Sequence, residues 1–129
     1  MIKRVLIIDD DEAIRKVFLL ALEGSEFQTD TAKSGKIGLE MIAQVKYDFI
    51  FLDLKMPEMD GIETLRRIRV MSEKIPVYII TAFSGEYFDR LTAIREAGID
   101  FELVRKPIGT GMIPQIVRAA TGGAEIVEP

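Results

Sequence analysis

Three short runs of apolar residues constrain the fold of this 129-residue chain more than any other feature. Residues 5–8, 49–52 and 77–80 read VLII, FIFL and VYII, without the alternation of apolar and charged positions that a half-exposed strand shows. Such a run is typical of a strand that is buried on both faces, which is the usual environment of a parallel sheet covered by helices. The three runs therefore predict the central strands of a parallel sheet.

Helical patterns separate these runs. Apolar residues recur at helical spacing within residues 14–22, 37–45, 62–71 and 86–97, and a short last helix is expected before Gly122. Ser34 is a candidate N-terminal cap for the second of these helices. Strands that alternate with helices indicate βαβ units with right-handed crossovers.

Two weaker segments complete the set of strands. Residues 27–31 and 101–105 are polar at alternate positions, which is typical of strands at the edge of a sheet. Only some strand orders put these two segments at the edges, and the order 2-1-3-4-5 is one of them. The predicted fold is therefore α/β, a single-domain, doubly wound, five-stranded parallel sheet of the flavodoxin-like type.

In this strand order, polar side chains from four strands meet at one edge of the sheet. Asp9 and Asp10 follow the first strand, Asp53 ends the third, Thr81 ends the fourth and Lys106 follows the fifth. Open α/β sheets bind ligands in the crevice at these carboxyl ends. Carboxylates that share a crevice repel one another unless a cation lies among them. Because these ligands are hard oxygens, Mg²⁺ is the predicted ion.

Each of these residues also has a simpler structural interpretation. The acidic residues 9–12 suit the start of a helix, where they complement its dipole. Asp53 suits the start of a turn, Thr81 is a common strand residue and Lys106 resembles any solvated lysine. That all of them lie at the carboxyl ends of neighbouring strands favours a functional site.

Composition excludes several kinds of chemistry. The chain has no Cys and no His, which excludes disulfides, thiolate and histidine catalysis, and zinc sites built from those residues. A net charge of −4 argues against a nucleic-acid-binding domain. No apolar stretch reaches the roughly 20 residues that a membrane span needs. We therefore expect a cytoplasmic protein that binds neither nucleic acid nor membrane.

Four motifs give the sequence a family resemblance. LIIDDDE, FLDLKMPEMDG, IITA and RKP occur in this order, and over residues 2–121 the chain resembles the receiver domains of two-component response regulators. The resemblance implies a signalling switch of a two-component system or phosphorelay rather than an enzyme, since such a domain catalyses only its own phosphorylation and dephosphorylation. Its partners would be a sensor histidine kinase or histidine phosphotransfer protein and a downstream target protein.

The resemblance also implies a role for each candidate site residue. Asp53 would be the phosphoacceptor, Asp10 a direct Mg²⁺ ligand, Asp9 a ligand through water and Lys55 a ligand through its main-chain carbonyl. Thr81 would bind a phosphoryl oxygen, Lys106 would pair with the phosphoryl group, and the Lys106–Pro107 peptide bond would be cis. Residues 122–129 are expected to form a flexible C-terminal tail.

The chain departs from the family pattern in the region that transmits the signal. Leu103 stands where the family usually has Tyr or Phe, the segment 98–106 is one residue longer than expected, and residues 108–117 lack early acidic residues. Because Leu103 has no polar tip, we expect the response to pass from Thr81 to residues 83–88, a segment that contains Tyr87 and Phe88.

Several alternatives remain at this point. An electron carrier of this fold needs a hydroxyl- and glycine-rich phosphate cradle after the first strand, where this chain has three acids. An aspartyl phosphohydrolase normally needs an acid at the position of Lys55. A protein-interaction module that works without phosphorylation would be expected to lack an acid or Lys106. The chain is either a stand-alone receiver or the receiver part of a longer response regulator.

Overall fold

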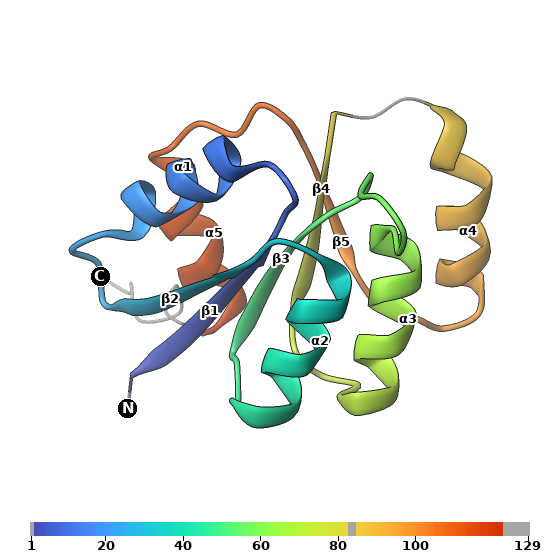
Figure 1. Cartoon of the computed structure of the whole chain (residues 1–129), viewed down its shortest axis with the longest axis horizontal. Coiled ribbons are helices and arrows are strands. Elements are labelled where there is room, and N and C mark those ends of the chain that lie inside the picture. The colour runs from blue at the N-terminus through green and yellow to red at the C-terminus, as the bar shows by residue number, and fades with distance from the viewer. Residues whose placement is uncertain (1, 83–84, 123–129) are drawn as a thin grey trace.

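A five-stranded parallel sheet forms the centre of the molecule (Figure 1). The computed structural model describes residues 2–82 and 85–122. The strand order is β2-β1-β3-β4-β5, which confirms the prediction. The strands are β1 (Lys3–Ile8), β2 (Phe27–Ala32), β3 (Phe49–Asp53), β4 (Val77–Thr81) and β5 (Glu102–Arg105).

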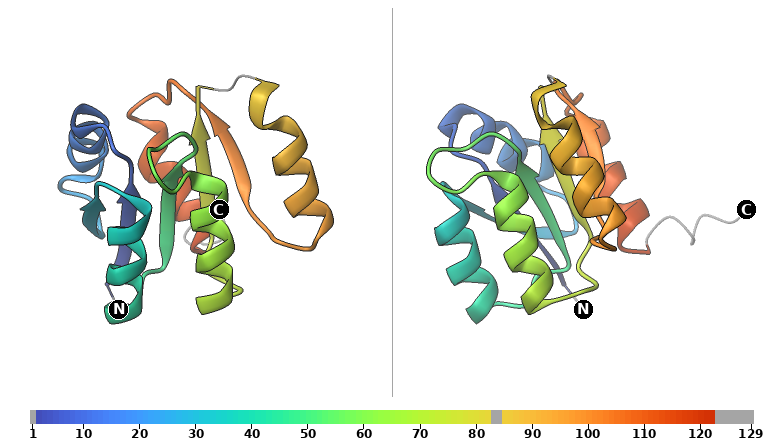
Figure 2. Two further views of the ribbon diagram at one scale, coloured as in Figure 1. Left: turned by 45° about the vertical axis from the view of Figure 1, so that its right-hand side comes forward. Right: turned by 90° about the vertical axis from the view of Figure 1, so that its right-hand side faces the viewer.

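Within the described residues, five α-helices cover the two faces of the sheet (Figure 2). They are α1 (Glu12–Leu22), α2 (Gly35–Gln44), α3 (Gly61–Met71), α4 (Phe88–Glu96) and α5 (Met112–Ala120). Helices α1 and α5 pack on one face through one cluster of buried apolar side chains. Helices α2, α3 and α4 pack on the other face through a second cluster. Every residue of β3 is buried, as its unbroken apolar sequence requires.

Side-chain caps fix the starts of three helices. The Ser34 hydroxyl accepts a hydrogen bond from the Ile37 N–H at 3.1 Å, so the predicted cap of α2 is confirmed. Asp11 caps α1 and Asp60 caps α3 in the same manner. Each cap satisfies one of the backbone donors that a helix N-terminus leaves without an intrahelical partner.

The segment around α4 differs from its predicted bounds. A helix was expected over residues 86–97, whereas the chain first makes a 3₁₀ turn, η1 (Gly85–Tyr87), and α4 begins only at Phe88. Tyr87 occupies the N-cap position and makes no side-chain capping bond, which is consistent with a tightened first turn. No helix within residues 2–82 and 85–122 is long and apolar enough to cross a membrane.

Gly61 closes the turn between β3 and α3 against the backbone of β3. Its N–H donates to the Leu54 carbonyl at 2.8 Å, and a Cβ at this position would lie 2.4 Å from the Asp53 carbonyl oxygen. Because backbone atoms cannot give way cheaply, we expect Gly61→Ala to lower the free energy of unfolding by about 1–3 kcal/mol. Urea denaturation measures this loss.

Gly109→Ala is the matched control for that substitution. A Cβ at Gly109 meets no heavy atom within 4 Å, and its φ lies outside the left-handed region. We expect this variant to stay within about 0.5 kcal/mol of the parent protein. Equal stability of the two variants would contradict the close approach at Gly61.

Candidate functional site

The predicted acidic residues meet at the carboxyl end of the sheet. Asp53 ends β3, and Asp9 and Asp10 directly follow β1, which pairs with β3. One carboxylate oxygen from each of the three residues lies within 4.8 Å of the others. Asp9 and Asp53 are only 3% and 7% exposed, whereas Asp10 is exposed. The three acids therefore form one cluster with a buried base and an open side.

Lys106 brings a positive charge into this cluster. Its Nζ lies 3.1 Å from Asp53 Oδ1 and 3.6 Å from Asp9 Oδ2. Its main-chain N–H donates to the Thr81 carbonyl at 2.7 Å, which holds the residue beside the end of β4. The Lys106–Pro107 peptide bond is cis, as the family resemblance implied.

The acidic run after β1 divides into two roles. Asp11 is the helix cap, because its carboxylate accepts from the Ala13 N–H at 2.9 Å. Asp9 instead points into the cluster and accepts from the Asp11 N–H at 2.9 Å. Arg15 donates to the Asp9 main-chain carbonyl at 2.8 Å and ties this loop to α1. The sequence left open whether the acidic run 9–12 caps a helix or belongs to a functional site. In the structure, Asp11 caps α1 and Asp9 belongs to the cluster.

A cavity of about 440 Å³ opens directly above Asp53. Its lining residues are Asp53, Lys55, Thr81, Ala82, Glu86, Tyr87 and Lys106. Four of these were predicted as site residues, namely Asp53, Lys55, Thr81 and Lys106. Sequence reasoning did not place Glu86 or Tyr87 in the cavity. The sequence indicates only that these two residues follow Thr81 closely. It does not reveal that η1 turns them toward the cavity.

Burial and like charges perturb the titration of the cluster. The pKa of Asp53 rises from 3.8 to about 6, first because of burial and then because of the Asp9 carboxylate, while Lys106 lowers it. Burial also raises the pKa of Asp9, although the hydrogen bond from Asp11 opposes this. Burial alone would lower the pKa of Lys106, but Asp53 and Asp9 outweigh it and the pKa is raised. At neutral pH the cluster therefore holds an ionised Asp53 carboxylate beside an ammonium ion.

The acidic cluster suits a hard divalent cation. Three carboxylates offer oxygen ligands within one small volume, and the pKa values of Asp9 and Asp53 are raised first by burial and further by neighbouring carboxylates. Carboxylates are preferred ligands of Mg²⁺, which keeps several of its own waters. The donor set thus fits the predicted ion.

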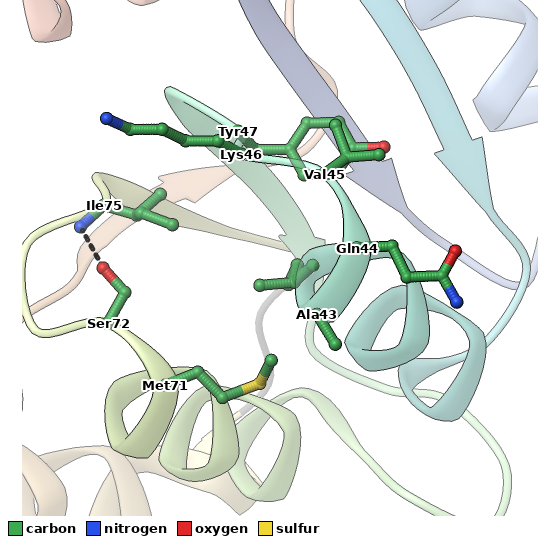
Figure 3. A pocket seen from close by; sticks show the side chains of 9 residues that line it. Ala43, Gln44, Val45, Lys46, Tyr47, Met71, Ser72 and Ile75 are labelled. Atoms are coloured by element: carbon green, nitrogen blue, oxygen red, sulfur yellow. Dashed lines mark hydrogen bonds between the residues drawn. The ribbon is translucent and has the colours of Figure 1, made fainter.

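A second pocket lies away from this cluster, between the C-terminal ends of α2 and α3 (Figure 3). Val45, Tyr47, Met71 and Ile75 give it a largely apolar wall, and its drawn hydrogen bond runs from the Ile75 N–H to Ser72. It contains none of the predicted site residues and no acid. We therefore assign the chemistry to the cavity above Asp53.

Comparison with known proteins finds a family match over most of the chain. The family model of the response regulator receiver domain matches residues 5–118. The KDP operon transcriptional regulatory protein KdpE of Escherichia coli is 39% identical over 116 residues, which cover 90% of this chain and 50% of KdpE. The chain spans between a quarter and about half of the length of the first curated relatives it matches.

Solved structures show the same fold. A CheY-like receiver domain protein from Methanospirillum hungatei superimposes with a TM-score of 0.82 at 23% identity, covering 98% of this chain and 99% of that one. The response regulator TrrA from Thermotoga maritima, solved in complex with Mg²⁺ and BeF, gives a TM-score of 0.77 at 27% identity, covering 92% of this chain and 99% of TrrA.

The raised pKa of Asp53 predicts a dependence of stability on pH. The folded pKa is about 6 and the unfolded value is 3.8, so this group's stabilising contribution is complete below 3.8 and is lost as the pH rises through 6. In a chelating buffer near neutral pH, we expect Asp53→Asn to raise the free energy of unfolding by on the order of 1–3 kcal/mol. The gain should largely vanish near about pH 4, as measured by urea denaturation.

Glu40→Gln is the control for this prediction. It makes the same change of carboxylate to amide at an exposed position of α2. Its effect on the free energy of unfolding should be small at both pH values, within about 0.5 kcal/mol. A neutral-pH stability of Asp53→Asn at or below that of the parent protein would contradict the electrostatic strain at Asp53.

Proposed function

The chain belongs to the response regulator receiver domain family. We propose that it is a phosphorylation-activated switch. In this proposal, Asp53 accepts a phosphoryl group from a phosphohistidine of a partner protein. One observation carries the proposal. The buried Asp53 carboxylate faces a cavity while it lies 3.1 Å from Lys106 and beside Asp9 and Asp10. This places a nucleophile beside an ammonium ion that can offset phosphoryl charge, and beside two carboxylates that can hold a cation.

Phosphoryl transfer would begin with an in-line approach of an Asp53 carboxylate oxygen to phosphorus. The bond from phosphorus to Asp53 forms as the bond from phosphorus to the imidazole nitrogen breaks, and that electron pair stays on the imidazole. The Lys106 ammonium stabilises negative charge on the equatorial oxygens. Thr81, which lines the same cavity, would bind one of these oxygens through its hydroxyl after transfer.

Asp9, Asp10, Asp53 and the main-chain carbonyl of Lys55 would hold the Mg²⁺ ion, with Asp9 acting through water. When bound, the ion supplies positive charge that offsets the repulsion between these carboxylates and the incoming phosphoryl oxygens. Before that, Lys106 is the positive charge close to the buried carboxylates, at 3.1 Å from Asp53 and 3.6 Å from Asp9.

The product would alter the surface around η1 and α4. An acyl phosphate adds charge of roughly −1.5 to −2 at a site whose cavity already holds Glu86. The predicted response through residues 83–88 stays a proposal, and Phe83 and Ser84 lie outside the described residues. Tyr87 and Phe88 are described, and they lie where η1 meets α4.

The partners that fit this chemistry are a sensor histidine kinase or histidine phosphotransfer protein and a downstream protein target. The domain itself would span residues 2–121, either alone or as part of a longer response regulator. A phosphorylation-independent interaction module is the second candidate, although the intact set of Asp53, Asp10 and Lys106 gives it no support. A kinase partner whose phosphohistidine lies in the cytoplasm would place this protein in the cytoplasm as well.

Incubation with acetyl phosphate tests the phosphoacceptor. With Mg²⁺ present, intact-mass measurement should show one added phosphoryl group on the parent protein, and chelation of Mg²⁺ should prevent the addition. Asp53→Asn should stay unmodified, because its amide has no nucleophilic carboxylate oxygen. Phosphate that still appears on Asp53→Asn would place the acceptor elsewhere, and an unmodified parent protein would favour the interaction module.

Lys106→Met tests the proposed role of the ammonium ion. Lys106 is partly exposed and lies at the rim of the core, so the variant should fold, with a circular dichroism spectrum like that of the parent. Phosphorylation of Asp53 by acetyl phosphate should be slower by about 10- to 1,000-fold, as for the loss of one charge-stabilising group. Lys55→Met is the control, since Lys55 would act through its carbonyl. Equal rates for Lys106→Met and the parent would exclude the proposed role.

A further inference from the structure

Tyr87 contributes an aromatic ring to the wall of the cavity above Asp53. It is half-buried and packs against the apolar cluster beneath α2, α3 and α4. The Asp53 charge is among the influences on its hydroxyl, whose pKa is raised first by burial and then by Glu86, Asp60 and Asp53, while Arg90 lowers it. The ring and the carboxylate therefore share one small volume.

Arg90 contacts this ring, and Asp60 in turn holds Arg90. The Arg90 guanidinium lies 5.8 Å from the centroid of the Tyr87 ring, within the range of a cation–π contact. Arg90 Nη1 also binds Asp60 Oδ2 at 2.8 Å. The other Asp60 carboxylate oxygen caps α3 through the Glu63 N–H. Asp60 thus connects the start of α4 to the loop between β3 and α3, which carries Lys55.

The anchored ring borders the space that a phosphoryl group on Asp53 would occupy. The β3–α3 loop and the start of α4 lie at the same end of the sheet (Figure 1). Asp53 is at the base of the cavity, and η1 contributes Glu86 and Tyr87 to its wall. Hydrolysis needs a water on the side of phosphorus opposite Asp53, and Tyr87 is one of the residues that line the cavity through which this water must approach.

We propose that Tyr87 is a positioning residue of the Asp53 site, whose ring, held by Arg90 and Asp60, restricts the approach of water to the phosphoryl group and so prolongs the phosphorylated state. This inference rests on the proposed function. In the step that it slows, the oxygen of water bonds to phosphorus as the bond from phosphorus to Asp53 breaks. The electron pair returns to the Asp53 carboxylate, one proton stays on the phosphate and the other goes to solvent.

The neighbouring aromatic residue gives a contrast. Phe88 is 60% exposed and lines a different pocket, together with Leu103 and Phe101 on the outer side of α4 and β5. Leu103 lies in that pocket and outside the lining of the Asp53 cavity. Among the described residues that line the Asp53 cavity, the aromatic side chain therefore comes from η1 and not from β5.

Decay of the phosphorylated protein tests the proposal. The parent and its variants are loaded with acetyl phosphate and Mg²⁺, the donor is removed, and the phosphorylated fraction is followed by intact mass. Tyr87→Ala should lose its phosphate about three- to tenfold faster, because water gains a route to phosphorus. Tyr87→Phe, which keeps the ring, should decay like the parent. Phe88→Ala is the matched control and should also decay at the parental rate.

Substitutions that break the Arg90–Asp60 ion pair provide an independent test by the same measurement, the rate of phosphate loss. Asp60→Asn keeps a side chain that can cap α3 but removes the charge that binds Arg90. This variant and Arg90→Met should both decay faster than the parent, and neither should accelerate decay further in the Tyr87→Ala background. Because both retain Tyr87, they test the proposal even where Tyr87→Ala does not fold.

The possible failures are distinct. Absence of phosphate on the parent protein overturns the proposed function and this inference together. Phosphate on the parent with equal decay in Tyr87→Ala, or in both anchor variants, overturns the inference alone. Equal acceleration by Phe88→Ala and Tyr87→Ala also overturns it, because the effect would then belong to the surface of α4 and not to the cavity. A thermal melt of each variant separates faster decay from general loss of structure.

Discussion

The burial of the Asp53 carboxylate beside the Asp9 carboxylate is the constraint on which the site depends. A buried charge is costly unless it is paired, and here the ammonium of Lys106 offsets only part of that cost, because the pKa of Asp53 still rises to about 6. The apolar strands supply the stability that keeps the acids in place. The site is therefore held in a state that binding of a cation would relieve.

The fold builds the cluster and the wall of its cavity from different elements. Asp53 ends the central strand β3, Asp9 directly follows β1 and Lys106 directly follows β5. The opposite wall comes from η1, whose helix α4 starts without a side-chain cap. Strand ends suit accurate positioning of a reacting group, and the wall supplied by η1 carries Glu86, whose charge an added phosphoryl group would repel.

The aromatic ring in the lining of the Asp53 cavity comes from η1 and not from β5. Leu103 of β5 is 43% exposed and lines a different pocket, together with Phe88. Tyr87 supplies a ring to the cavity from η1. Arg90 lies over this ring and pairs with Asp60, which joins α4 to the β3–α3 loop. A change at Asp53 thus has a short physical route to α4 that does not require movement of a side chain on β5.

The sequence by itself determined the sheet, its strand order and the convergence of the acids with Lys106, because unbroken apolar runs specify doubly buried strands and parallel strands carry their following residues to one edge. It also determined the Ser34 cap, which depends on neighbours three residues away. Only the tertiary structure decided that Tyr87 lines the cavity above Asp53 and that Arg90, beside its ring, pairs with Asp60. Those outcomes depend on the path of each loop and on contacts between residues far apart in the chain, such as the pair Asp60 and Arg90. No local pattern encodes them.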